Sequence, residues 1–266
     1  MRAASLFAAA ATLVAAAACA TPLLTKPEKL GRAPVLPSLQ GLVPLKVIPA
    51  LGDNSGDSGR TALQALSRGR WARACSVSTA VLARKAPDVE ALGVFGLCSA
   101  VTRDRQAAET ALARLRGVEN PGYFSLLTQG VLHLQDRAPD KAQAQFRAVL
   151  QTHPEDPLAL YFDGEALHAR QQTVAAINSF QATLKQWPDY TPALIAASRL
   201  MAGPKASSEE LSVATSMAER ATALEPMNTG YWRLLADLYR RTGQLGRAQG
   251  IELQHVRASQ SLVPEK

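Results

Sequence analysis

The sequence predicts an all-α fold, in which about six helix-turn-helix repeats form a curved solenoid behind an export signal and a proline-rich tether. Three observations support this prediction: small residues recur at a regular period, prolines end several helices, and the composition suits helices packed by small side chains. Of the 266 residues, 47% are hydrophobic, 19% are charged and 5% are aromatic. These values exclude a disordered chain, a small disulfide-rich domain and a polytopic membrane protein.

Residues 1–18 have the features of a signal peptide. Arg2 precedes an apolar, alanine-rich run from Leu6 to Ala18, and a short basic region followed by about a dozen apolar residues is typical of an export signal. A membrane-spanning helix needs about 20 apolar residues. Pro22 and Lys26 end this run too early for that, so export is the preferred interpretation.

Cys19 has two expected processing outcomes. The segment Ala16-Ala17-Ala18-Cys19 resembles a bacterial lipobox, which implies lipid attachment at Cys19. Because Ala20 rather than aspartate follows, the resemblance points to an outer-membrane lipoprotein that faces the periplasm. The alternative is ordinary cleavage after Ala18 or Ala20, which would leave a soluble periplasmic protein.

Residues 19–54 are expected to be a tether, because their prolines exclude a regular helix and favour extended conformations. These prolines are Pro22, Pro27, Pro34, Pro37, Pro44 and Pro49. The part from Val35 to Leu51 is unusually apolar for a free linker, which indicates that it lies against another surface. The polar segment from Gly52 to Asp57 is a clear break before the repeats.

A period of about 34 residues runs through the rest of the chain. Alanines recur at Ala74, Ala108, Ala142, Ala176, Ala214 and Ala248, at equal gaps except that the fourth gap is longer by four. Small residues recur with the same period at Ala62, Gly96, Gly130, Gly164, Ser198 and Ala236, twelve positions before the alanines except for Ser198, which lies sixteen before Ala214. The period predicts one domain over residues 55–262, with units that start near residues 55, 89, 123, 157, 191 and 229.

Each unit reads as a helix, a turn and a second helix. In residues 157–190, Leu160, Gly164 and Leu167 share one helical face, and Ala176, Phe180 and Leu184 share the next. Pro154, Pro188 and Pro226 end second helices. The four extra residues fall at 203–206, and the segment from Ser207 to Glu210 predicts a capping box that opens the following helix.

The repeats resemble the tetratricopeptide repeat family. The last unit carries the family pattern most fully, with Trp232, Leu235, Ala236, Tyr239, Gly243 and Ala248. The resemblance covers nearly the whole chain after the tether and implies an α-α superhelix. Glu252 and His255 depart from the pattern, since the last helix should be apolar there.

The repeat architecture also predicts a disulfide. Cys75 lies in the second helix of the first unit and Cys98 in the first helix of the second unit. Stacked repeats make these helices neighbours, and an exported protein meets an oxidising compartment. We therefore expect Cys75 and Cys98 to be bonded, with two buried free thiols as the alternative.

The sequence predicts no catalytic site, no metal site and no cofactor. It holds no nucleophile-elbow serine, phosphate loop or dinucleotide fingerprint. Glu165 and His168 have the spacing of a di-iron half-site, but such sites need a second copy of the motif and further carboxylates. The net charge is +7, but the basic residues are spread over all units, so nucleic acid is not an expected partner.

Family resemblance implies a concave, protein-binding groove lined by the first helix of each unit. The apolar positions expected there are Leu97, Val101, Phe124, Leu127, Val131 and Leu134. The polar and aromatic positions are Tyr161, Glu165, His168, Arg199, Arg233, Asp237, Arg240 and Arg241. Three alternatives remain for the apolar half: a client peptide or helix covers it, the tether 35–51 folds into it, or its side chains pack between units.

These features together predict a non-catalytic scaffold of the bacterial cell envelope. The layout resembles the six-repeat pilotin lipoproteins of type IV pilus systems, which implies a secretin or another pilus or secretion component as the partner. The alternative is a regulatory adaptor for peptidoglycan synthases or hydrolases, which would have a cell-wall enzyme as its partner.

Overall fold

The computed structural model of the protein describes residues 58–67, 70–84, 88–116, 122–226 and 228–260. The predicted signal peptide, the lipid attachment at Cys19 and the tether lie outside the described residues. Within them, no helix has the length and apolar character needed to cross a bilayer.

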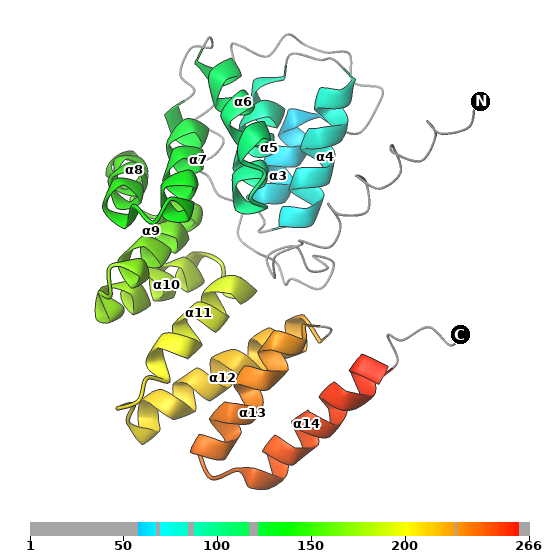
Figure 1. Ribbon diagram of the computed structural model, residues 1–266, viewed down its shortest axis with the longest axis vertical. Coiled ribbons are helices and arrows are strands. Elements are labelled where there is room, and N and C mark those ends of the chain that lie inside the picture. Colours follow the sequence, from blue (N-terminus) through cyan, green and yellow to red (C-terminus); the bar gives the residue numbers. More distant parts are fainter. Residues whose placement is uncertain (1–57, 68–69, 85–87, 117–121, 227, 261–266) are drawn as a thin grey trace, which may run out of the picture.

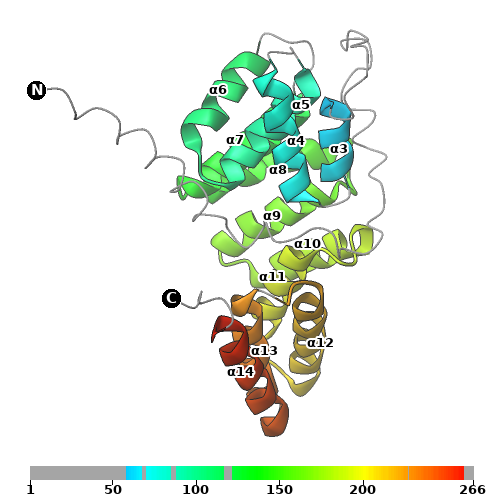
Figure 2. The same cartoon turned by 90° about the vertical axis from the view of Figure 1, so that its right-hand side faces the viewer.

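The described residues form twelve helices and no strand, so the predicted all-α fold is confirmed. In chain order the helices are α3 (Gly59–Leu66), α4 (Trp71–Ala83), α5 (Val89–Val101), α6 (Arg105–Leu115), α7 (Gly122–Gln135), α8 (Pro139–Thr152), α9 (Pro157–Ala169), α10 (Thr173–Gln186), α11 (Thr191–Met201), α12 (Ser208–Leu224), α13 (Thr229–Arg241) and α14 (Leu245–Gln260). Each helix packs on the next along the chain. Both views place α3–α8 at one end, α12–α14 at the other and α9–α11 between them (Figures 1 and 2).

The small residues of the repeat are required by close helix packing. A Cβ atom added to Gly130 would lie 2.3 Å from the ring of Phe146, and one added to Gly164 would lie 2.7 Å from the ring of Phe180. Both rings are fully buried, so they fill the space that a side chain at the glycine would need. The repeated glycine in the first helix and the repeated phenylalanine in the second are therefore one packing device.

The turn between the two helices of a unit contains a residue in the left-handed backbone conformation. Arg103, Arg137 and Gln171 hold the same position in three successive units and have φ values of 65°, 56° and 61°, and Gly243 has a φ of 76°. A residue in this conformation ends a helix by directing its N–H toward the last free carbonyls. Three units therefore place a larger residue where glycine is the least strained choice.

Helix starts are set by polar caps. The predicted capping box is confirmed: the Ser207 hydroxyl accepts from the Glu210 N–H at 3.1 Å, and the Glu210 carboxylate accepts from the Ser207 N–H at 2.7 Å. The buried Asp156 caps α9 by accepting from the Ala159 N–H at 2.8 Å. Asp156 also accepts from the Tyr123 hydroxyl at 3.0 Å, which joins one unit to the next.

The core is continuous over most of the solenoid. One cluster of buried apolar side chains extends from α3 to α11, whereas two smaller clusters hold α12–α14 and join them to α11. Aromatic rings fill the middle of the large cluster: Phe146 stacks on Phe162 with centroids 5.6 Å apart, and Tyr161 meets Tyr190 edge-on at 5.2 Å.

Candidate functional site

The apolar half of the predicted groove lies inside the protein. Leu97 and Leu127 are fully buried, and Val101, Phe124 and Val131 are at most 8% exposed. All five belong to the large core cluster, and the half-buried Leu134 packs against it. The structure therefore corrects the prediction of an exposed apolar lining: these side chains pack between units, which was one of the three alternatives.

The physical reason is the close approach of successive first helices. A Cβ atom added to Gly93 in α5 would lie 2.3 Å from the ring of Phe124 in α7, so these helices touch through their inward faces. Burial of such side chains stabilises each by about 1.5–3 kcal/mol. The sequence pattern places residues on the inward face but does not say how tightly that face closes.

Trp71 contacts two aromatic residues that lie far along the sequence. The indole Nε1, at the start of α4, donates a hydrogen bond to the Tyr190 hydroxyl at 3.0 Å, across 119 residues of sequence. The Trp71 ring also meets Phe162 of α9 edge-on, with centroids 6.3 Å apart. Sequence reasoning missed this contact, because Trp71 stands outside the repeated columns.

The predicted disulfide between Cys75 and Cys98 is confirmed. Their Sγ atoms are 2.06 Å apart and their Cα atoms 5.6 Å apart. The bond joins α4 to α5 and closes a loop with a sequence separation of 23 residues. Loop closure of this length stabilises by about 3 kcal/mol in the chain-entropy model.

The polar half of the predicted groove stays open. His168, Arg199, Arg233 and Asp237 are exposed, as are Arg240 and Arg241, whereas Tyr161 is buried in the aromatic cluster. The exposed groups lie on α9, α11 and α13, the first helices of three successive units. The structure thus keeps an accessible charged face in the second half of the solenoid.

Glu165 lies at the inner edge of this face. Its side chain is half-buried, and the described residues provide no hydrogen-bond donor to its carboxylate. Burial raises the pKa of Glu165 from 4.5 to about 7, against an opposing effect of the Arg199 charge. A carboxylate held this way costs stability when ionised, a common feature of binding sites.

The arginines of this face differ in whether another group of the protein already binds them. Arg240 pairs with Glu252 of α14. The Arg241 guanidinium donates to the backbone carbonyls of Ala202 and Gly203 that follow α11. Arg199, Arg233 and Asp237 are exposed and take part in none of these bonds, although the charge of Arg199 acts on the Glu165 carboxyl.

A recess separate from the polar face lies between α12 and the turn from α13 to α14. It has a volume of about 410 Å³ and is lined mainly by hydroxyl, amide and charged side chains: Ser208, Leu211, Ser212, Thr215, Ser216, Glu219, Arg241, Thr242 and Gln244. Sequence reasoning missed it. The one available signal is the spacing of Ser208, Ser212 and Ser216, which puts three hydroxyls on one face of α12.

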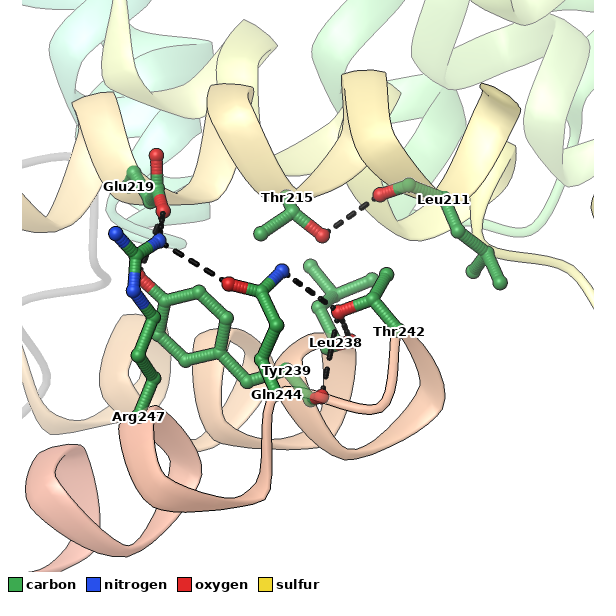
Figure 3. A network of polar contacts seen from close by, with 8 residues as sticks. All are labelled: Leu211, Thr215, Glu219, Leu238, Tyr239, Thr242, Gln244 and Arg247. Carbon is green, nitrogen blue, oxygen red and sulfur yellow. Dashed lines mark hydrogen bonds and ion pairs between the residues drawn. The ribbon is translucent and has the colours of Figure 1, made fainter. Parts of the chain in front are cut away.

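Several polar groups at this recess form a network of hydrogen bonds with neighbouring side chains of α13 and α14 (Figure 3). Glu219 accepts from the Tyr239 hydroxyl at 2.6 Å and from Arg247 at 3.3 Å. Arg247 also donates to Gln244 at 3.1 Å and lies 5.5 Å above the centre of the Tyr239 ring. Burial and the Glu219 carboxylate raise the pKa of Tyr239. This network joins α14 to α12, so these polar contacts stabilise the packing of the last unit.

The described residues contain no group of three or more histidine, cysteine, aspartate or glutamate side chains placed to hold a metal ion. Glu165 and His168 lie one helical turn apart on α9, and Glu165 is half-buried whereas His168 is exposed.

Comparison with known proteins agrees with the repeat architecture. A tetratricopeptide repeat family model matches residues 127–191, which lie within helices α7–α11 of the repeats. No curated protein matches the sequence.

Solved structures show the same fold. A MamA RS-1 double mutant is 20% identical, with a TM-score of 0.50 over 65% of this chain and 98% of that one. Yeast Tom70 is 14% identical, with a TM-score of 0.54 over 75% of this chain and 42% of that one. The Cut9–Hcn1 hetero-tetramer of the APC/C is also 14% identical, with a TM-score of 0.53 over 80% and 42%. At these identities the similarity concerns the fold alone.

Proposed function

We propose that the protein is a non-catalytic scaffold of the bacterial cell envelope, which binds a client segment on the polar face formed by α11 and α13. The fold supports a protein–protein interaction scaffold in general terms. The observation that carries the more specific proposal is the exposure of Arg199, Arg233 and Asp237, while the apolar half of the groove is buried.

Two of these three residues, Arg199 and Arg233, suit an acidic client. Arg199 and Asp237 hold the same position in successive units, and Arg233 lies one turn before Asp237 on α13. Together with the nearby Arg240 and Arg241 they give the face an excess of positive charge. Such a surface attracts a segment rich in aspartate and glutamate and speeds its association.

The envelope location is supported by the signal-like residues 1–18 and by the disulfide. A bond between Cys75 and Cys98 persists in an oxidising compartment such as the periplasm, and is rare in the reducing cytosol. In the more specific form of the proposal, the protein is anchored through Cys19 at the outer membrane and assists pilus or secretion complex assembly. A role as adaptor for peptidoglycan synthases or hydrolases is the alternative.

The test is client capture from envelope extracts followed by affinity measurement. We expect Arg199→Glu combined with Arg233→Glu to weaken the captured client at least tenfold, and the affinity of the unchanged protein to fall with added salt. The matched control is Arg114→Glu on α6, an exposed arginine at the other end of the solenoid. Equal affinity of both variants and the unchanged protein would reject the polar face, and the identity of the client separates secretion components from cell-wall enzymes.

A further inference from the structure

The first unit differs from the other units in the sign of its charge. Between Ser58 and Pro87 the sequence has basic residues but no aspartate or glutamate. The basic residues are Arg60, Arg68, Arg70, Arg73, Arg84 and Lys85. Each later pair of helices, from α5 and α6 onward, contains at least one acidic residue. The first pair, α3 and α4, is therefore the one whose positive charge is not offset by acidic residues of its own.

The charges of this pair are accessible at one end of the solenoid. Arg60 on α3, Arg73 on α4 and Arg84 after α4 are exposed, and Arg70 before α4 is half-buried. We call these four arginines the basic end. The other exposed positions of the two helices carry uncharged side chains: Gln64, Ser76, Thr79 and Ala83. Both views place α3 and α4 at the end of the molecule opposite α12–α14 (Figures 1 and 2).

The first acidic groups that follow this pair are already engaged in the fold. The Asp88 carboxylate accepts from the N–H groups of Gly59 and Ala91, both at 2.8 Å, so it caps α3 and α5 together. Glu90 is 4% exposed, and burial raises its pKa to about 7, with Asp88 adding to the rise and Arg60 opposing it. Neither carboxylate thus presents a fully exposed negative charge beside the basic end.

Exposed arginines of later helices have carboxylates beside them. Arg105 of α6 pairs with Glu109 and Asp136, and Arg220 of α12 pairs with Asp189. Such pairs reduce the local potential, because the two charges cancel at a distance. The positive potential of the described chain is therefore expected to be least compensated at α3 and α4.

The basic end suits a diffuse anionic surface better than a folded protein partner. Specific protein interfaces are centred on large side chains that bury in pockets, and the exposed large apolar side chains of the described residues lie on α10, α12 and α14. A lipid surface needs no such anchor, since each basic residue near it strengthens binding by about fivefold through charge alone. The planar guanidinium of arginine also donates two parallel hydrogen bonds to a phosphate group.

The position of this pair in the chain supports the same partner. Residues 1–57 precede the described part and include the expected export signal and the expected lipid attachment at Cys19. Attachment there would bring α3 to the membrane before any other helix and raise its effective concentration at the lipid headgroups. A lipid chain and a basic patch together give stable membrane binding where one alone is marginal.

We propose that the basic end docks on an anionic phospholipid surface and orients the solenoid, with α3 and α4 at the headgroups and α12–α14 away from them. Docking itself rests on the charges of α3 and α4. Only its consequence, that the polar face of α11 and α13 is presented to a client, rests on the proposed scaffold function.

Docking is tested by sedimentation of the full chain with lipid vesicles, using Cys19→Ser to remove the lipid attachment site. Vesicles of equal parts phosphatidylglycerol and phosphatidylcholine are compared with vesicles of phosphatidylcholine alone, on which any apolar contribution of other segments is the same. We expect tighter binding to the anionic vesicles and loss of this preference as salt is added. Equal binding to both kinds of vesicle would overturn the proposal.

The location of the docking surface is tested by charge reversal. Arg60→Glu combined with Arg73→Glu should weaken binding to anionic vesicles about tenfold or more. The matched control, Lys141→Glu combined with Arg147→Glu, changes the net charge equally at two exposed positions of α8 and should weaken binding about twofold at most. Equal losses would show that net charge alone attracts the protein, which would overturn a defined docking end.

A second variant guards against a folding defect. Arg60→Gln combined with Arg73→Gln should give a loss between those of the reversal and the control, with helical content by circular dichroism unchanged in all three. Full vesicle binding by this variant would overturn the assignment to α3 and α4. If soluble polyglutamate binds through the same two arginines more tightly than the vesicles do, the partner is an acidic protein segment and the lipid proposal is wrong.

The outcome is independent of the client test. Arg199→Glu combined with Arg233→Glu, which should weaken client capture, is expected to bind anionic vesicles as the α8 control does. Failure of client capture therefore leaves docking unaffected, and failure of docking leaves the polar face unaffected. A loss of vesicle binding in this variant as large as that of the first-unit reversal would place the lipid contact on the polar face and overturn the proposal.

Discussion

The two halves of the solenoid share one repeat length but are held together differently. From α3 to α11 the buried side chains form one cluster that includes Phe146, Phe180 and Trp187, each at most 1% exposed. The α12–α14 region has smaller clusters built on alanine, leucine and tyrosine. Covalent and long-range links, the disulfide and the Trp71–Tyr190 bond, occur in the first region.

Polar contacts take the place of that packing in the last unit. Arg240 pairs with Glu252, and Arg247 pairs with Glu219, with side chains 41–65% exposed. Exposed ion pairs contribute about 0–1 kcal/mol each, much less than a buried aromatic ring. The difference shows that one repeat pattern can build a rigid core at one end and an accessible, charged surface at the other.

The largest effect is expected from a buried ring of the first region. Phe180→Ala should lower the free energy of unfolding by about 4 kcal/mol, because it leaves a cavity beside Gly164 that the packed helices cannot fill. Leu238→Ala in α13 should cost about 3 kcal/mol. Urea unfolding measures both, with the exposed Val174→Ala on α10 as control. A larger loss for Leu238→Ala would reverse the proposed order of the two regions.

Loss of the disulfide is expected to cost about 3 kcal/mol through the entropy of the unfolded chain. The double substitution Cys75→Ser and Cys98→Ser should lower the unfolding midpoint of the first region and leave local exchange in α13 and α14 unchanged. Thermal unfolding combined with hydrogen exchange distinguishes the regions. An equal rise of exchange in α13 and α14 would indicate that the solenoid unfolds as one unit.

Glu165→Gln is expected to stabilise the protein in a pH-dependent way. The pKa of Glu165 is raised from 4.5 to about 7, so the folded state holds its proton longer than the unfolded state. Stability attributable to this group is therefore greatest below about pH 4.5 and declines as pH rises toward about 7. At pH 8 we expect the variant to be more stable by about 2 kcal/mol, allowing for partial solvation of the carboxylate.

The measurement is urea unfolding at pH 4.5 and pH 8, with the exposed Glu209→Gln on α12 as the matched control. The two variants should differ at pH 8 and converge at pH 4.5. The same gain for Glu165→Gln at both pH values would show that packing, and not the cost of an enclosed charge, accounts for it.

The smallest changes in the free energy of unfolding are expected at two tyrosine–carboxylate hydrogen bonds. Tyr123 donates to the buried Asp156 at 3.0 Å, and Tyr239 donates to the part-buried Glu219 at 2.6 Å. We expect Tyr123→Phe to cost about 2 kcal/mol and Tyr239→Phe about 1 kcal/mol, since an unpaired buried carboxylate is the more expensive. Equal losses, measured by chemical unfolding, would show that burial does not distinguish these contacts.

The sequence predicted those features that depend on spacing along the chain. The repeated small residues predicted helix pairs, and the structure shows why Gly130 and Gly164 must be small. The capping box at Ser207 and the pairing of Cys75 with Cys98 were also predictable, because both follow from positions within or between adjacent units.

Contacts between distant units could not be predicted in this way. The hydrogen bond between Trp71 and Tyr190 spans 119 residues, and no repeated column marks either partner. The recess beside α12 depends on how Arg247 and Gln244 fold back toward Glu219, which the period does not specify. The apolar groove residues were assigned to the correct helices, but their burial between units was one of three alternatives that the sequence could not separate.

The sequence by itself thus determined that the protein is a solenoid of helix pairs, where a few of its helices begin or end, and which cysteines meet. The tertiary structure decided which inward-facing positions are core and which are surface. The reason is physical: a repeat period fixes the direction of a side chain through local geometry, whereas its burial depends on the curvature of the whole stack and on side chains, such as Trp71, that come from far along the chain.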